Sequence, residues 1–97
     1  MAKSYRVIAK VHELRAETGR EPCPYFTLNQ EFDLSNPDER KNVCKWAHHS
    51  MFPLAAVLEF GGVFPWESDP DKALVAYPDP HRIVVFELRR EEKSVED

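Results

Sequence analysis

The chain has 97 residues, of which 42% are hydrophobic and 31% are charged. This length and composition are typical of one compact globular domain and exclude a two-domain or largely disordered chain. Thirteen Lys and Arg residues against seventeen Asp and Glu residues give a net charge of −4, and no basic block stands out, so nucleic acid is not expected as the main partner.

Alternating hydrophobicity from Ser4 to Leu14 predicts the first strand, with Val7, Ala9 and Val11 on one face. A polar loop over residues 15–24 follows. Residues 25–34 predict a second, short strand that turns near Asn29-Gln30.

Asn36, Pro37 and Glu39 form a helix start, because Asn36 can cap, Pro37 suits the first helical position and Glu39 completes a capping box. Pro53 predicts a kink or a restart, since it removes a backbone hydrogen bond. Gly61-Gly62 predicts the helix end. The residues expected on the buried face are Val43, Trp46, Ala47, Met51, Leu54, Val57, Leu58 and Phe60.

Residues 73–77 and 82–90 predict two further strands, joined by a turn at Pro78-Asp79-Pro80-His81. The second is apolar on both faces, which indicates a central strand, and Arg89 and Arg90 are expected at its solvated end. The sequence therefore predicts one α+β domain over residues 1–90, in the order β-β-α-β-β, with one helical layer on a mostly antiparallel sheet. Residues 91–97 are expected to be a charged, frayed tail.

No apolar run approaches the roughly 18 residues of a membrane span, and no export signal follows Met1. We therefore expect no membrane association and a cytoplasmic protein. In that compartment Cys23 and Cys44 are expected to be free thiols.

Cys44 and His48 are four residues apart on the predicted helix and share one flank. A thiol with an imidazole one turn away can be a nucleophile and its base, which makes these two the catalytic candidates. The same two side chains with Cys23 and His81 are candidate ligands for a soft metal. The alternative is a half-buried cysteine that only packs, beside a surface histidine.

The run Phe60-Gly61-Gly62-Val63-Phe64-Pro65-Trp66 is the second unusual feature. Its glycines allow close backbone approach, and Phe64 and Trp66 offer flat apolar surface. The run can form the wall of a ligand pocket or a docking patch. Alternatively it closes a thin core.

With these residues in view, the chain resembles a family of small uncharacterised prokaryotic proteins of about this length. The motifs that carry the resemblance are Cys23-Pro24, Cys44-Lys45-Trp46-Ala47, Leu58-Glu59-Phe60-Gly61-Gly62, Phe64-Pro65-Trp66, Asp69-Pro70-Asp71, Pro78-Asp79-Pro80 and Val84-Val85-Phe86-Glu87-Leu88-Arg89-Arg90. The resemblance spans nearly the whole chain and implies an architecture but no activity or cofactor. It also implies that relatives often carry a third cysteine where this chain has Tyr77.

The leading hypothesis is a non-catalytic domain that binds a small molecule or a protein partner. Its crevice would lie between the helix and the loop from Gly61 to Trp66, with Cys23, Cys44, Phe64 and Trp66 as the binding residues. The alternative is a thiol-dependent enzyme or soft-metal protein that uses Cys44, His48 and Cys23. A homo-oligomer held by exposed aromatic residues is a third alternative.

Overall fold

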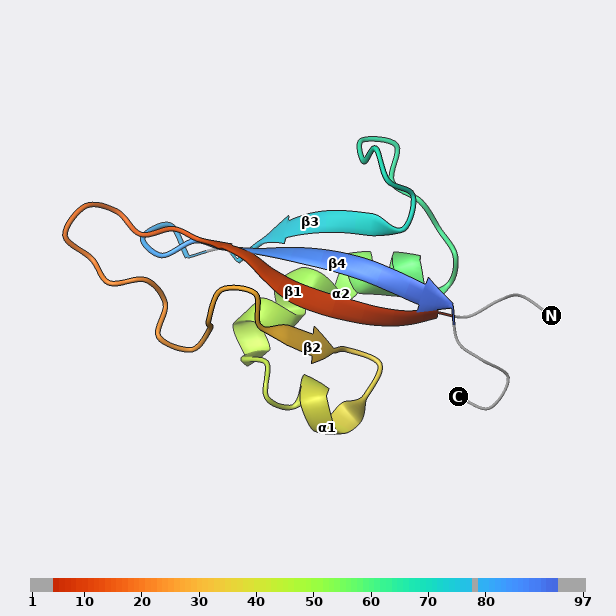
Figure 1. The fold of residues 1–97 in the computed structure, drawn as a ribbon, viewed down its shortest axis with the longest axis horizontal. Helices are drawn as coiled ribbons and strands as arrows, with labels where there is room; N and C mark the ends of the chain where they lie inside the picture. Colours follow the sequence, from red (N-terminus) through yellow and green to blue (C-terminus); the bar gives the residue numbers. More distant parts are fainter. Residues whose placement is uncertain (1–4, 78, 93–97) are drawn as a thin grey trace.

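The computed structural model describes residues 5–77 and 79–92 and confirms the predicted α+β fold. Ser4, Pro78 and residues 93–97 of the predicted elements lie outside the described residues. The elements in chain order are β1 (Tyr5–Leu14), β2 (Glu31–Asp33), α1 (Pro37–Arg40), α2 (Lys45–Glu59), β3 (Lys72–Ala76) and β4 (Val84–Glu92) (Figure 1). β4 continues to Glu92, two residues beyond the predicted strand end at Arg90.

The four strands form one antiparallel sheet in the order β2-β1-β4-β3, so β4 has a neighbour on each side as its apolar run predicts. α2 covers one face of the sheet, and α1 lies beside β2 (Figure 1). The face toward α2 carries buried apolar side chains such as Val7, Phe86 and Leu88. The opposite face carries ion pairs, which are Arg6–Asp33, Lys72–Glu87, Arg89–Glu31 and Arg89–Glu91.

Asn36 caps a helix as predicted, its side chain accepting from the Asp38 N–H at 2.9 Å. That helix, α1, ends at Arg40, so the prediction of one helix from here onward was wrong. α2 starts anew at Lys45 because Cys44 takes an extended conformation, with φ −61° and ψ 150°, and caps it. Two separately capped helices replace the single one.

α2 runs through Pro53 without a restart, so of the two outcomes predicted at Pro53 the restart was wrong and the kink stays a prediction. Its buried residues are Ala47, Met51, Ala55 and Leu58, at spacings of three and four. Trp46, Val57 and Phe60 are exposed, so their predicted place on the buried face was wrong. The helix is apolar on two sides, and only one of them packs on the sheet.

Gly61-Gly62 ends α2 as predicted. Gly61 has φ +87°, which glycine adopts without a steric cost. A Cβ on Gly62 would lie 2.6 Å from Cγ1 of Val57, so a larger residue does not fit there. Arg90 reaches this turn from β4 and donates to the carbonyl oxygens of Leu58 and Gly62.

Candidate functional site

Cys23 and Cys44 lie around Tyr77, close to the start of α2. Both cysteines are free thiols; Cys23 is buried in the core and Cys44 is half-buried against it. The Cys44 Sγ accepts a hydrogen bond from the Ala47 N–H at 3.4 Å, which is the helix cap itself. The structure thus brings the two predicted cysteines to one place, where Cys44 already has a structural task.

Tyr77 is buried between this pair and Trp46, whose ring centroid lies 5.2 Å from that of Tyr77. Burial, followed by the neighbouring Cys44 and then Cys23 and Asp79, raises the pKa of Tyr77 to about 12. Tyr77 is therefore a neutral phenol at physiological pH.

Phe64 and Trp66 lie together, with ring centroids 5.1 Å apart, after the other end of α2. The 15 residues of α2, about 22 Å of helix, separate them from Cys44 along the chain. Phe64 packs on the core and Trp66 is exposed. The predicted crevice with both groups in one wall stays a prediction, and the cavities described next are lined by other residues.

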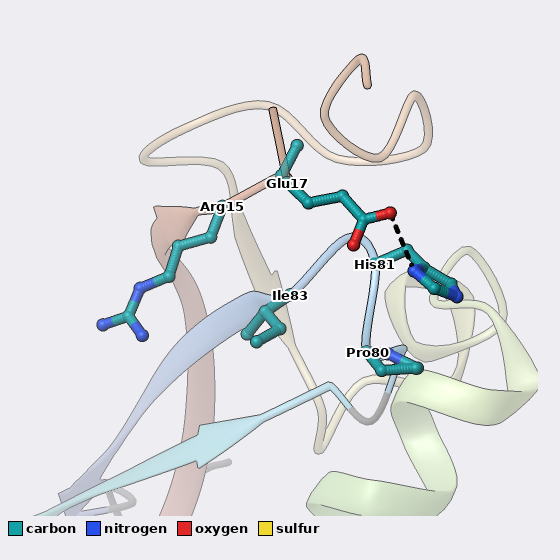
Figure 2. Close-up of a pocket in the computed structure, with 6 residues that line it drawn as sticks. Arg15, Glu17, Pro80, His81 and Ile83 are labelled. Atoms are coloured by element: carbon teal, nitrogen blue, oxygen red, sulfur yellow. Dashed lines mark hydrogen bonds and ion pairs between the residues drawn. The ribbon is translucent and has the colours of Figure 1, made fainter. Parts of the chain in front are cut away.

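His81, a predicted metal candidate, lies in the loop between β3 and β4. It pairs there with Glu17, which belongs to the loop after β1. Its Nδ1 is 3.0 Å from the Glu17 Oε1, and the two line a cavity of about 230 Å³ with Arg15, Pro80 and Ile83 (Figure 2). Hydrogen bonds from His81 and then Arg20 lower the pKa of Glu17. The pair joins two loops, and Glu17 and His81 are both exposed to solvent.

His48 lies in a groove between α1 and α2. Three cavities adjoin here, of about 370, 420 and 50 Å³, and His48 lines all three. We call this surface the His48 groove; its lining includes Arg40, Lys41, Lys45, His48, Phe52 and Ala55. His48 makes a ring contact with Phe52, with centroids 5.8 Å apart, and its predicted partnership with Cys44 stays a prediction.

The groove is positively charged. Burial lowers the pKa of His48, and the charges of Arg40 and His49 lower it further. Arg40, Lys41 and Lys45 form no ion pair in the described part of the chain, whereas Arg6, Arg15, Arg20, Lys72, Arg89 and Arg90 each do. Sequence reasoning missed this site.

One feature of the sequence indicates the His48 groove. Residues 40–58 contain three Lys or Arg and two His but no Asp or Glu, in a chain whose net charge is −4. The cations and histidines lie within residues 40–49 and are interrupted by neutral residues, so they do not stand out as a block. Cys44, extended between the two helices, places Arg40 and Lys41 in the same cavity wall as Lys45 and His48.

Residues 5–77 and 79–92 contain no group of three His, Cys, Asp or Glu side chains placed to hold a metal ion. The four predicted metal candidates therefore divide among three places: the cysteine pair, the His48 groove and the Glu17–His81 contact. In the same residues, no helix has both the length and the apolar character needed to cross a membrane.

Searches of family models, curated proteins and solved structures found no match to this chain, so its function is argued from its own residues.

Proposed function

We propose that this chain is a non-catalytic domain that binds a partner protein along α2. The observation that carries the proposal is the second apolar side of that helix. Its members are the exposed apolar residues Trp46, Phe52, Pro53, Val57 and Phe60. At about 100° per residue, Trp46, Pro53, Val57 and Phe60 share one side of the helix, and Phe52 lies apart from them on the side of the groove. We call them the α2 strip.

The α2 strip has more apolar surface than a solvent-facing helix side normally carries. Trp46 is 52% exposed, Phe52 59% and Phe60 74%. Burial of apolar surface contributes roughly 25 cal/mol per Å², and aromatic side chains dominate the energetics of protein interfaces. A strip beside a groove supplies both a flat contact and a recess for an inserted side chain.

A partner protein fits this surface better than a second copy of the chain. In a two-fold symmetric dimer the same patch meets itself, so the contact joins two surfaces that both carry the unpaired Arg40, Lys41 and Lys45. Like charges at an interface oppose association. The homo-oligomer alternative therefore predicts a repulsive contact at this site.

The test is a selection of random 12-residue peptides on the immobilised protein, followed by affinity measurements on those recovered. Peptides should bind the wild type and lose about tenfold or more in affinity to Phe52→Ser, since one anchoring aromatic contributes at least 1–2 kcal/mol. Leu74→Ser is the matched control, because Leu74 is 48% exposed but lies on the opposite side of the sheet. Failure to recover any specific peptide, or equal loss with both variants, contradicts the proposal.

A thiol-dependent reaction is the second candidate, favoured by the meeting of Cys44, Cys23 and Tyr77. The cap position places the Cys44 sulfur at the positive end of α2, where the thiol is half-buried beside Tyr77. Alkylation by iodoacetamide should then be faster at Cys44 than at a free cysteine in solution, with Cys44→Ser as the control. A Cys44 that reacts no faster than the free amino acid excludes this candidate.

A further inference from the structure

The cations of the two helices cluster where α1 ends and α2 begins. The segment from Arg40 to Leu58 carries Arg40, Lys41, Lys45 and two histidines and no carboxylate, while the whole chain is negative. On the opposite face of the molecule, cations and anions alternate and neutralise each other in ion pairs. The carboxylates of these helices, those of Asp38 and Glu39 at the start of α1 and of Glu59 at the end of α2, form no ion pair with Arg40, Lys41 or Lys45 in the described residues.

The cations of this side are free to meet a ligand. Arg40, Lys41 and Lys45 are exposed and line one cavity together with Pro37, Val43 and His48. Of the two carboxylates of α1, that of Glu39 accepts from the Asp33 N–H and the Asn36 side chain, and that of Asp38 forms no ion pair with these cations in the described residues. An anion entering the groove would not have to displace an existing partner.

The same groove has apolar walls. Val7, Leu34 and Ala55 lie along it, and Phe52 lines two of its three cavities. It also meets the α2 strip at Phe52. A ligand that satisfies all of this surface needs carboxylates and apolar side chains within a few residues of each other.

We infer that the occupant of the His48 groove is an acidic segment of a partner protein, with carboxylates against Arg40, Lys41 and Lys45 and an apolar side chain against Phe52. This inference rests on the proposed function and adds the chemical class of the partner. A nucleic acid would meet only three clustered cations and a negative remainder of the chain, which is too little positive charge for phosphate binding. Complementary charge also speeds the encounter and fixes the orientation of the bound segment.

The experiment uses the peptides selected on the full chain. The expected result is an enrichment of Asp and Glu next to Phe, Leu or Trp. Affinity for these peptides should fall about tenfold in Lys41→Gln/Lys45→Gln, since each charge-assisted contact contributes on the order of threefold. The matched control is Lys10→Gln/Arg15→Gln, which removes the same charge elsewhere and should leave affinity unchanged.

The outcomes separate the two proposals. Recovered peptides without an acidic excess, which still lose affinity to Phe52→Ser, overturn this inference and leave the proposed function standing. Recovery of no specific peptide overturns both. Equal affinity for a 20-nucleotide single-stranded DNA overturns the inference in favour of a general anion surface, because the DNA supplies the charge without the apolar anchor. All variants are compared after thermal melting shows that each is folded.

Discussion

The Arg90 side chain joins the last strand to the end of α2. It is only 7% exposed and forms an ion pair with Asp71 at 2.9 Å. Its guanidinium donates to two carbonyl oxygens at the helix end and lies 4.8 Å from the centre of the Tyr5 ring. The predicted solvated position of Arg90 was therefore wrong. The hydropathy of the sequence around Arg90 does not indicate that the end of α2, with the carbonyls of Leu58 and Gly62, packs beside it in the fold.

Arg90→Ala should lower the free energy of unfolding by about 2–4 kcal/mol, because it removes two hydrogen bonds to part-buried carbonyl groups, of which only that of Leu58 keeps another donor, the Gly61 N–H, and because it removes the ion pair. Urea denaturation measures this. Arg89→Ala is the matched control: Arg89 pairs with Glu31 and Glu91 on the outer face of the sheet, where such pairs contribute about 0–1 kcal/mol. An equal decrease in the free energy of unfolding in the two variants would show that the hydrogen bonds of Arg90 to the end of α2 do not stabilise the fold.

Tyr77 should make the free energy of unfolding decrease as pH rises in the alkaline range. Its pKa is raised to about 12 in the fold, above its ordinary value, so folding favours the neutral phenol. This contribution, up to about 3 kcal/mol, is fully present below pH 10 and is lost as pH rises toward 12. Wild type should therefore lose more stability over this range than Tyr77→Phe, as measured by urea denaturation at each pH. Parallel curves for the two proteins would contradict the assignment.

At the scale of elements, α2 carries a proline that its packing tolerates. Pro53 offers no N–H to the His49 carbonyl, and its side chain is exposed. Pro53→Ala should restore that bond and raise the free energy of unfolding by about 1–3 kcal/mol. Pro24→Ala, in an exposed loop, is the control and should change stability little. A loss of stability in Pro53→Ala would mean that the ring makes contacts that outweigh the missing bond.

The order and type of the elements could be predicted from periodicity, because each strand packs one face and each helix has a local cap. Asn36, Gly61 and the apolar run of Val84 to Phe86 are local signals of this kind. The bounds of α2 depend on Cys44 adopting an extended conformation, which no sequence rule assigns to cysteine. Nor could the buried side of α2 be predicted, since Trp46 and Met51 are equally apolar and only tertiary packing separates them.

At the scale of the whole molecule, the sheet divides two surfaces of different character. One is a set of mutually neutralised charges on the far side of the sheet, and the other is α2 with its apolar strip and unpaired cations. The meeting of Cys23 and Cys44 could be predicted from the element order. The His48 groove could not, because it depends on the angle at which α1 leaves the sheet to face α2.

Acid is expected to act on the α2 side of the molecule through His48. His48 is faced by Arg40 from α1, by Lys45 and His49 from α2, and by Glu59 at the far end of the groove. Burial and then Arg40 and His49 lower its pKa, so the free protein should lose stability as pH falls below the ordinary histidine value of 6.5. A bound acidic segment reverses this preference, because its carboxylates stabilise the protonated imidazole.

Affinity for an acidic peptide should therefore rise as pH falls from about 7.5 to about 5.5, a range in which peptide carboxylates remain ionised. Fluorescence anisotropy at each pH measures this. His48→Gln should flatten the dependence, whereas His12→Gln, a change at an exposed position of β1, should leave it as in the wild type. The thermal midpoint of the free protein supplies the second readout, since acid should lower it less in His48→Gln than in the wild type. An affinity that decreases as pH is lowered, or a pH dependence equally steep in His48→Gln and in the wild type, would show that His48 does not contact the peptide. The role of the unpaired lysines would still be tested by their own variants.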